Sequence, residues 1–460
     1  MAFEENEIYA VGDVFTPSSV ASLTFVPRES INAKLVDSLR TKGKQLVVYG
    51  HSGCGKTTLL ENKLKQLFPL HIKTSCMKGM TFGEILADPL RQLNAMFVSE
   101  KAEKSAGKFG ASVSTPKEIV FPVGFSFEQC QEDLTKSVPI APHTVTPHTV
   151  AEVLGANSAC WVLEDFHKVD SSEKLRLAQC MKMFMDLSAR YPDLKMIFIG
   201  AVHTAHKVVE YDPELSNRVA EIHVPLMTED ELRKIINLGE QALNISIDSR
   251  ITDRIVTVSN GLAAVTHQIA LNFCHARSIE VTQNQKVYLD TGKWIPALER
   301  YLESSSDTLR TVFEKSVKNM KKRKYDHGRV ILSALTKVPQ TGASQAELLQ
   351  IIRKTEPAYP AASLAIHLKA LQSDERCNIV SCDENTGDYS FSEPVHRAFC
   401  YMLFESEQKS SARVSAKTQS VSDFLKQLVP ELAEQIARLE NNRFDNLKKD
   451  QFGRTIESKT

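Results

Sequence analysis

Gly50-His51-Ser52-Gly53-Cys54-Gly55-Lys56-Thr57 is the stretch that decides the fold of this chain. It follows the apolar run Leu46–Tyr49 and precedes Thr58-Leu59-Leu60, which predicts a strand, a loop and a helix in that order. Backbone N–H groups in such a loop surround phosphates, and the helix N-terminus adds partial positive charge. A glycine-rich turn without function is the alternative. Lys-Thr at the required offset disfavours it.

The loop therefore predicts a site for ATP and Mg²⁺. Lys56 is placed to reach the β- and γ-phosphates, and the Thr57 hydroxyl is placed to hold Mg²⁺. The residues predicted to bind the phosphates are Gly50, Ser52, Gly53, Cys54, Gly55, Lys56, Thr57 and Thr58.

Composition and charge favour an ordinary globular protein. The 460 residues include 56 Lys plus Arg and 56 Asp plus Glu, so no global charge attracts nucleic acid. Nine scattered cysteines favour a reducing compartment. The acidic N-terminus lacks a signal-peptide pattern, and no apolar run approaches the length of a membrane span. We therefore expect a cytoplasmic protein.

Patterning divides the chain into parts of different character. Short apolar runs alternate with helical segments between Phe25 and Val224, which predicts an α/β fold with a parallel sheet. The strands are expected at Gln45–Tyr49, Leu70–Thr74, Cys160–Glu164, Lys195–Ile199 and Ala220–Val224. The expected parts are an N-terminal lead-in without firm order (1–20), an α/β core (21–227) with an insertion at about 76–158, a helical lid with a basic linker (228–325), a winged helix (326–405), and a flexible linker with an amphipathic C-terminal helix (406–460).

Several local patterns leave alternatives open. Residues 101–127 in the insertion are either a hairpin that touches a partner or a mobile surface loop. Thr146-Pro147 is interpreted as the start of a helix, which is favoured over a metal site at the neighbouring histidines. The basic run is either a solvated linker or a contact to a nucleic-acid backbone through Lys318, Lys321, Lys322, Arg323 and Lys324.

The helix at about Ala361–Gln372 would read DNA in a DNA-binding winged helix. It offers His367 and Lys369 as basic groups, and the turn at 383–388 is acidic. Docking to a protein partner is therefore favoured over reading of DNA.

Two acids follow the apolar strand that ends at Glu164. A nucleotide-bound Mg²⁺ needs a nearby carboxylate, and hydrolysis needs a second acid that orients water. Glu164 and Asp165 meet both needs, although a surface acidic pair is the alternative. His203 or Thr204, after the next strand, is placed to sense the γ-phosphate. Arg218 either crosses to the nucleotide of a neighbouring subunit or pairs with a local carboxylate.

The order of these features resembles that of the AAA+ and STAND classes of P-loop ATPases, with origin-recognition initiators as architectural relatives. The motifs that carry the resemblance are Phe25-Val26-Pro27-Arg28-Glu29, the phosphate loop, the acidic strand, Asn217-Arg218, the helical lid and the winged helix. The resemblance implies that Phe25 and Arg28 lie near the adenine, that Glu164 binds Mg²⁺ and that Asp165 orients the attacking water.

This chain departs from the resembled pattern at two positions. Glu164 stands where aspartate is usual, and Ala264 stands near the place of a lid arginine. His267, one turn later, either substitutes for that arginine or is a buried structural histidine. We therefore expect slow hydrolysis, with the nucleotide acting mainly as a conformational switch.

The leading hypothesis is a switch ATPase that couples nucleotide state to assembly with protein partners and forms an ATP-dependent homo-oligomer. By analogy, bacterial anti-phage (antiviral) defence is the expected context. The alternatives are a DNA-binding initiator, loader or transposition-regulator ATPase, and a nucleotide-dependent scaffold without significant hydrolysis.

Overall fold

The structure is a computed structural model that describes residues 7–68, 70–93, 145–201, 215, 218–304, 307–318 and 324–407, together with the backbone of 96–100, 119–120 and 136–139. The chain divides into two compact units, Met1–Phe399 and Cys400–Thr460. The second unit is described over residues 400–407, which are helical. The expected flexible linker and amphipathic C-terminal helix lie outside the described residues.

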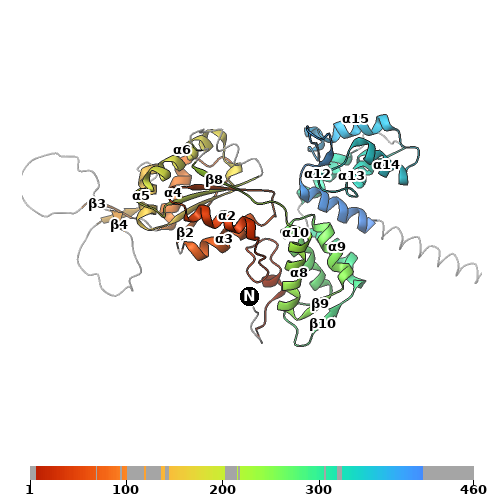
Figure 1. Cartoon of the computed structure of the whole chain (residues 1–460), viewed down its shortest axis with the longest axis horizontal. Helices are drawn as coiled ribbons and strands as arrows, with labels where there is room; N and C mark the ends of the chain where they lie inside the picture. The colour runs from red at the N-terminus through yellow and green to blue at the C-terminus, as the bar shows by residue number, and fades with distance from the viewer. Residues whose placement is uncertain are drawn as a thin grey trace, which may run out of the picture. The chain divides into compact units, whose positions relative to one another are not determined.

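A parallel five-stranded sheet forms the core of the first unit (Figure 1). Its strands are β1 (Gln45–Tyr49), β2 (His71–Ser75), β6 (Cys160–Glu164), β7 (Lys195–Gly200) and β8 (Val219–His223). Their order in the sheet is β2-β6-β7-β1-β8, and every pairing between them is parallel. The predicted fold class is confirmed, and each predicted strand lies within one residue of the observed one at either end.

Helices cover both faces of this sheet (Figure 1). α2 (Glu29–Arg40) and α3 (Lys56–Leu67) pack on one face, and α4 (Phe82–Gln92), α5 (Pro147–Ala156) and α6 (Ser171–Leu187) pack on the other. Successive strand residues point to opposite faces of the sheet. Cys160 and Val162 therefore belong to the core on the side of α2 and α3, while Trp161 and Leu163 belong to the core on the side of α4, α5 and α6. Continuous apolar strands with two helical layers are what a buried parallel sheet requires.

The insertion contributes a small antiparallel sheet of its own. It contains β3 (Met96–Glu100), β4 (Ile119–Val120) and β5 (Lys136–Pro139), in the order β4-β3-β5. The β-like pattern predicted around Ile119-Val120 agrees with β4. The rest of residues 101–127 lies outside the described residues. The Thr146 hydroxyl caps α5 by accepting from the N–H of Thr149 at 3.2 Å, as predicted.

A helical lid follows β8. Its elements are α8 (Glu229–Leu243), β9 (Ile245–Ile247), α9 (Ser249–Ser259), α10 (Ala263–Ala276), β10 (Val287–Leu289) and α11 (Trp294–Ser304). A capping box starts α8, because Thr228 and Glu231 exchange hydrogen bonds.

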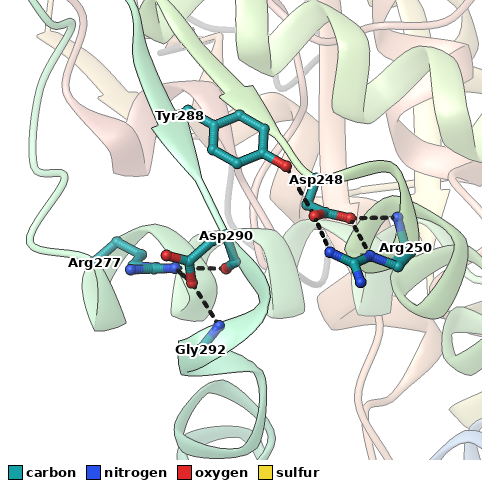
Figure 2. Close-up of polar contacts among 6 residues, drawn as sticks. All are labelled: Asp248, Arg250, Arg277, Tyr288, Asp290 and Gly292. Carbon is teal, nitrogen blue, oxygen red and sulfur yellow. Dashed lines mark hydrogen bonds and ion pairs between the residues drawn. The ribbon is translucent and has the colours of Figure 1, made fainter.

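Two aspartates lie where the paired strands of the lid end (Figure 2). Asp248 follows β9, accepts from the guanidinium of Arg250 at 2.7 Å and accepts from the Tyr288 hydroxyl at 2.8 Å. Asp290 follows β10 and accepts from Arg277 and from the Gly292 N–H. Each carboxylate thus ties the end of a short strand to the helix that comes next, because short strands alone fix little backbone.

The N-terminal segment is ordered from residue 7, contrary to the expected loose lead-in. The short helix α1 (Val11–Val14) packs on α8 and α10, and Val14 and Phe15 are completely buried. The ring of Phe15 lies where a Cβ on Gly239 would come within 2.2 Å. The segment is therefore part of the lid's core.

The last part of the first unit contains α12 (Asp307–Val317), α13 (His327–Leu335), α14 (Gln345–Thr355), α15 (Ala361–Leu371) and a hairpin of β11 (Val380–Cys382) with β12 (Tyr389–Phe391). The order from α13 onward is the one predicted for a winged helix, and the capping box at Ser344 and Glu347 is present. On α15, Leu364, Leu368 and Leu371 are buried, whereas Ile366 is 66% exposed. Among the described helices, none combines the length and the apolar character needed to cross a bilayer.

Candidate nucleotide-binding site

A cavity of about 410 Å³ lies at the carboxyl ends of β1 and β6. This edge of a parallel sheet is where open α/β folds bind ligands, because the loops there meet the N-termini of helices. The cavity is lined by the phosphate loop with the start of α3 (52–59), by Glu164 and Asp165 after β6, by the N-terminal segment (16–21, 24–26 and 28), and by lid residues including Ala263, Ala264 and His267.

The phosphate loop has the backbone conformation that its glycines predict. Gly53 and Gly55 have φ of 79° and 92°, a backbone conformation that residues other than glycine rarely adopt. A Cβ on Gly50 would lie 2.3 Å from the carbonyl oxygen of Val224, so that position also requires glycine. α3 begins at Lys56, directly after the loop, so its free N–H groups point toward the cavity.

Lys56 is folded back on its own loop. Its Nζ donates to the carbonyl oxygens of Gly50 at 3.0 Å and His51 at 2.8 Å. Burial lowers the pKa of Lys56 from its ordinary value, while Asp165 and other anions nearby oppose this shift. The ammonium group thus lies at the phosphate loop, held by neutral carbonyl groups.

The two acids after β6 differ in their surroundings. The Oε1 atom of Glu164 is buried and has no hydrogen-bond partner among the described residues. Asp165 adopts a left-handed backbone (φ 57°) and pairs with Lys168, with 2.7 Å between Oδ2 and Nζ. A buried carboxylate oxygen without a partner is costly in a protein alone, and it fits the oxygen ligand that Mg²⁺ prefers. Thr57 lines the same cavity, so the residues present fit the metal.

Arg28 lines the cavity, but its guanidinium group binds the segment that connects the core to the lid. It pairs with Glu231 at 3.1 Å and donates to the carbonyl oxygens of Pro225 and Leu226 at 2.8 and 3.1 Å. Phe25, the other residue predicted near the adenine, also lines the cavity.

The lid contacts the phosphate loop directly. The N–H of Ala264 donates to the carbonyl oxygen of Gly53 at 3.1 Å, and a Cβ on Gly53 would lie 3.2 Å from the Cβ of Ala264. One turn further along α10, His267 is 4% exposed and also lines the cavity. Burial lowers the pKa of His267 to about 4, so its imidazole is neutral near pH 7. Of the two roles considered for His267, the structure shows the buried histidine.

Arg218 stands apart from this cavity, and two other groups of predicted residues lie wholly or partly outside the described residues. Arg218 is half exposed and pairs with Asp186 at 3.2 Å, so within one chain the local ion pair is what forms. His203 and Thr204 lie outside the described residues. In the basic segment, Lys318 and Lys324 are described, whereas Lys321, Lys322 and Arg323 are not.

The model of one protein family matches the chain from the N-terminal segment to α14. It is that of novel STAND NTPase 1, and it matches residues 15–350, more than half of the chain. The chain belongs to the novel STAND NTPase 1 family. The predicted resemblance to a STAND-class P-loop NTPase is thereby confirmed. No curated protein matches this family member.

Solved structures similar to this STAND NTPase include three archaeal proteins. A Walker-type ATPase of Pyrococcus abyssi is 16% identical with a TM-score of 0.49, and the match covers 82% of this chain and 96% of that one. The ORC2 protein of Aeropyrum pernix, in ADPNP–ADP complexes, is 13% identical with a TM-score of 0.47, and covers 87% and 98%. Cdc6p of Pyrobaculum aerophilum is 14% identical with a TM-score of 0.42, and covers 86% and 98%.

Sequence reasoning missed one wall of the site in this STAND NTPase. Residues 16–20, assigned to the lead-in, line the cavity together with the phosphate loop. It also missed contacts at the start of the helix after β12: the Glu393 carboxylate accepts from Nδ1 of His51 at 3.2 Å, and Asn260 donates to the carbonyl oxygen of Pro394 at 3.1 Å. These contacts join residues 342 and 134 positions apart, and no local pattern marks them.

Proposed function

We propose that this STAND NTPase binds ATP with Mg²⁺ in the cavity and hydrolyses it slowly, as a switch. One observation carries the proposal: the phosphate loop, the N-terminus of α3 and the buried, unpartnered Oε1 of Glu164 meet in a single cavity in the described part of the chain. Loop and helix N–H groups bind anions, and the free carboxylate oxygen suits a cation beside them.

Each residue of the site has a role in this proposal. Phosphates lie against residues 53–57, and Lys56 exchanges its bonds to Gly50 and His51 for bonds to phosphate oxygens. Thr57 and Glu164 hold Mg²⁺, which supplies positive charge to the β- and γ-phosphates when bound. Asp165 orients the attacking water.

Slow turnover follows from two features of the same cavity. Asp165 is engaged by Lys168, so its carboxylate must exchange partners before it can orient water. The lid residues that line the cavity, Met227, Ile235, Ala263, Ala264 and His267, include no lysine or arginine among those described. Hydrolysis thus lacks a lid cation that would stabilise the transition-state charge, unless a second subunit supplies Arg218.

The switch works through the joint between core and lid. Ala264 bonds to the phosphate loop and Arg28 holds residues 225–226, so a nucleotide that changes the loop acts directly on the lid. We propose that lid closure is passed to the α12–α15 region and to protein partners, with an ATP-dependent homo-oligomer as the active form. Anti-phage defence as the context rests on analogy alone.

The test is nucleotide binding by titration calorimetry with ATP and ADP. We expect Lys56→Ala to abolish binding while its thermal unfolding stays close to wild type, because Lys56 bonds to loop carbonyls and not to the core. Lys65→Ala, an exposed position on the same helix, is the matched control and should bind as wild type does. Undiminished affinity in Lys56→Ala would overturn the proposal. Mass measurement with and without ATP tests the oligomer.

A further inference from the structure

We propose that Thr16 and His267 form a recognition pair for the nucleoside part of the bound nucleotide. The inference rests on the proposed function, because it assigns residues to the second half of the same ligand. It adds a polar contact between the N-terminal segment and α10 to the residues that line the cavity.

The first observation is the hydrogen bond that joins the two residues. The backbone N–H of Thr16 donates to Nδ1 of His267 at 3.2 Å. A backbone N–H can only donate, so Nδ1 is the acceptor and the imidazole proton resides on Nε2. His267 is buried and its pKa is lowered to about 4, so it stays in this neutral form near pH 7. The imidazole is therefore a neutral donor through Nε2–H.

The second observation is the hydroxyl of Thr16. Its Oγ1 is buried and has no hydrogen-bond partner in the described part of the chain, although Thr16 lines the cavity. The residue is held in place on both sides, because Phe15 is fully buried and Pro17 restricts the backbone before it. A fixed, buried hydroxyl without a partner is unfavourable in the free protein and is satisfied by a polar group of a ligand.

The position of Thr16 and His267 in the cavity favours contact with the nucleoside rather than with the phosphates. Phosphates are confined to residues 53–57 and Glu164, where the N–H groups and the metal carboxylate lie. The pair belongs to the wall made by the N-terminal segment and the lid, whose other members include the apolar Val20, Phe25, Val26, Met227 and Ile235. Such a wall accepts a flat base and a sugar, and rejects a trianionic phosphate chain.

The chemistry of the pair also suits a nucleoside. A threonine hydroxyl donates and accepts, and a neutral imidazole N–H donates. Base edges and ribose hydroxyls offer both kinds of group. Neither Thr16 nor His267 carries charge, so the pair adds affinity for the nucleoside without discriminating between ATP and ADP.

The experiment compares ADP with tripolyphosphate, a ligand that has no nucleoside. Thr16→Val keeps the shape of the side chain and removes its hydroxyl, and Thr16→Ser is the control that keeps the hydroxyl. We expect Thr16→Val to weaken ADP binding about tenfold, the usual effect of losing one buried hydrogen bond. Tripolyphosphate binding should stay within about twofold of wild type, and Thr16→Ser should keep most of the ADP affinity.

Two results would contradict the proposed role of Thr16 and His267 in nucleoside binding. One is unchanged ADP affinity in Thr16→Val, and the other is an equal loss for ADP and tripolyphosphate, which indicates a loosened cavity. Wild-type protein that binds neither ligand refutes the proposed function itself, and is thereby distinguished from both.

A measurement without nucleotide tests His267 separately. Nitrogen NMR shifts of its imidazole should show the Nε2–H form, and a proton on Nδ1 would contradict the assignment. His267→Phe, which removes both the acceptor for the Thr16 N–H and the Nε2–H donor, should lose ADP affinity and retain tripolyphosphate affinity.

Discussion

Arg28 and Glu231 form an ion pair at the turn between the core and the lid, with 3.1 Å between Nε and Oε1. The residues are 203 positions apart, and their side chains are 6% and 19% exposed. The rest of the guanidinium binds the carbonyl oxygens of Pro225 and Leu226, which lie directly before α8. One side chain thus fixes the path by which the core becomes the lid.

We expect Arg28→Met to lower the free energy of unfolding by about 3 kcal/mol, because Glu231 and the two carbonyls lose their donors in a poorly solvated place. Chemical denaturation measures this. The matched control is Arg233→Met, whose pair with Asp253 is more exposed at 35% and 56%. That variant should change stability by about 0.5 kcal/mol or less. Equal effects of the two substitutions would contradict the role of Arg28.

Glu164→Gln should slow phosphate release about 100-fold while ADP affinity in the absence of Mg²⁺ stays near wild type, because only the proposed metal ligand changes. Asp165→Asn should also slow release, with Mg²⁺-dependent ATP binding preserved. A steady-state phosphate assay and calorimetry separate these effects. Equal phosphate release from wild type and both variants would remove the catalytic assignment and favour a nucleotide-dependent scaffold.

The lowered pKa of His267 predicts that the folded chain loses stability in acid. Its pKa is lowered by burial to about 4 in the folded chain, against about 6.5 when unfolded, so the unfolded state binds a proton first. Stability attributable to this residue is complete above pH of about 6.5 and falls as the pH drops toward 4, by about 3 kcal/mol in total. Denaturation of wild type and His267→Gln across this range should give curves that converge in acid. Parallel curves would show that His267 does not titrate in this way.

Gly239→Ala should destabilise the chain by about 2 kcal/mol, since the new Cβ would come within 2.2 Å of the Phe15 ring that joins the N-terminal segment to α8. Gly83→Ala is the control, because nothing lies within 4 Å of its Cβ position in α4. We expect it to be neutral or stabilising by up to about 1 kcal/mol. Thermal unfolding and limited proteolysis near residue 16 measure both variants, and a stable Gly239→Ala would show that the segment packs differently.

The sheet and the phosphate loop could be predicted because their signals are local. Five runs of strand length are separated by helical segments, and the three central strands β1, β6 and β7 are nearly continuous in their burial. The glycines at 53 and 55 and the Lys-Thr pair occupy fixed offsets, so their geometry follows from the loop itself. The cap at Thr146 depends on a few adjacent residues, and it was predicted correctly.

The packing of residues 7–20 into the fold could not be predicted in the same way. The segment has too few apolar residues to appear structured alone, and it is ordered because Phe15 fills the space above Gly239. Packing by distant residues thus decided the burial of this segment.

The sequence by itself predicted a phosphate-binding loop at residues 50–57, because a loop between a strand and a helix carries its chemistry in consecutive residues. Only the tertiary structure decided what surrounds that loop. It left one buried carboxylate oxygen of Glu164 without a partner among the described residues, and it paired Arg28 with Glu231 of the lid. It also formed the hydrogen bond between Thr16 and His267, which are 251 positions apart. Such contacts depend on how separate elements pack, and burial then sets the charge and the free hydrogen bonds of each group.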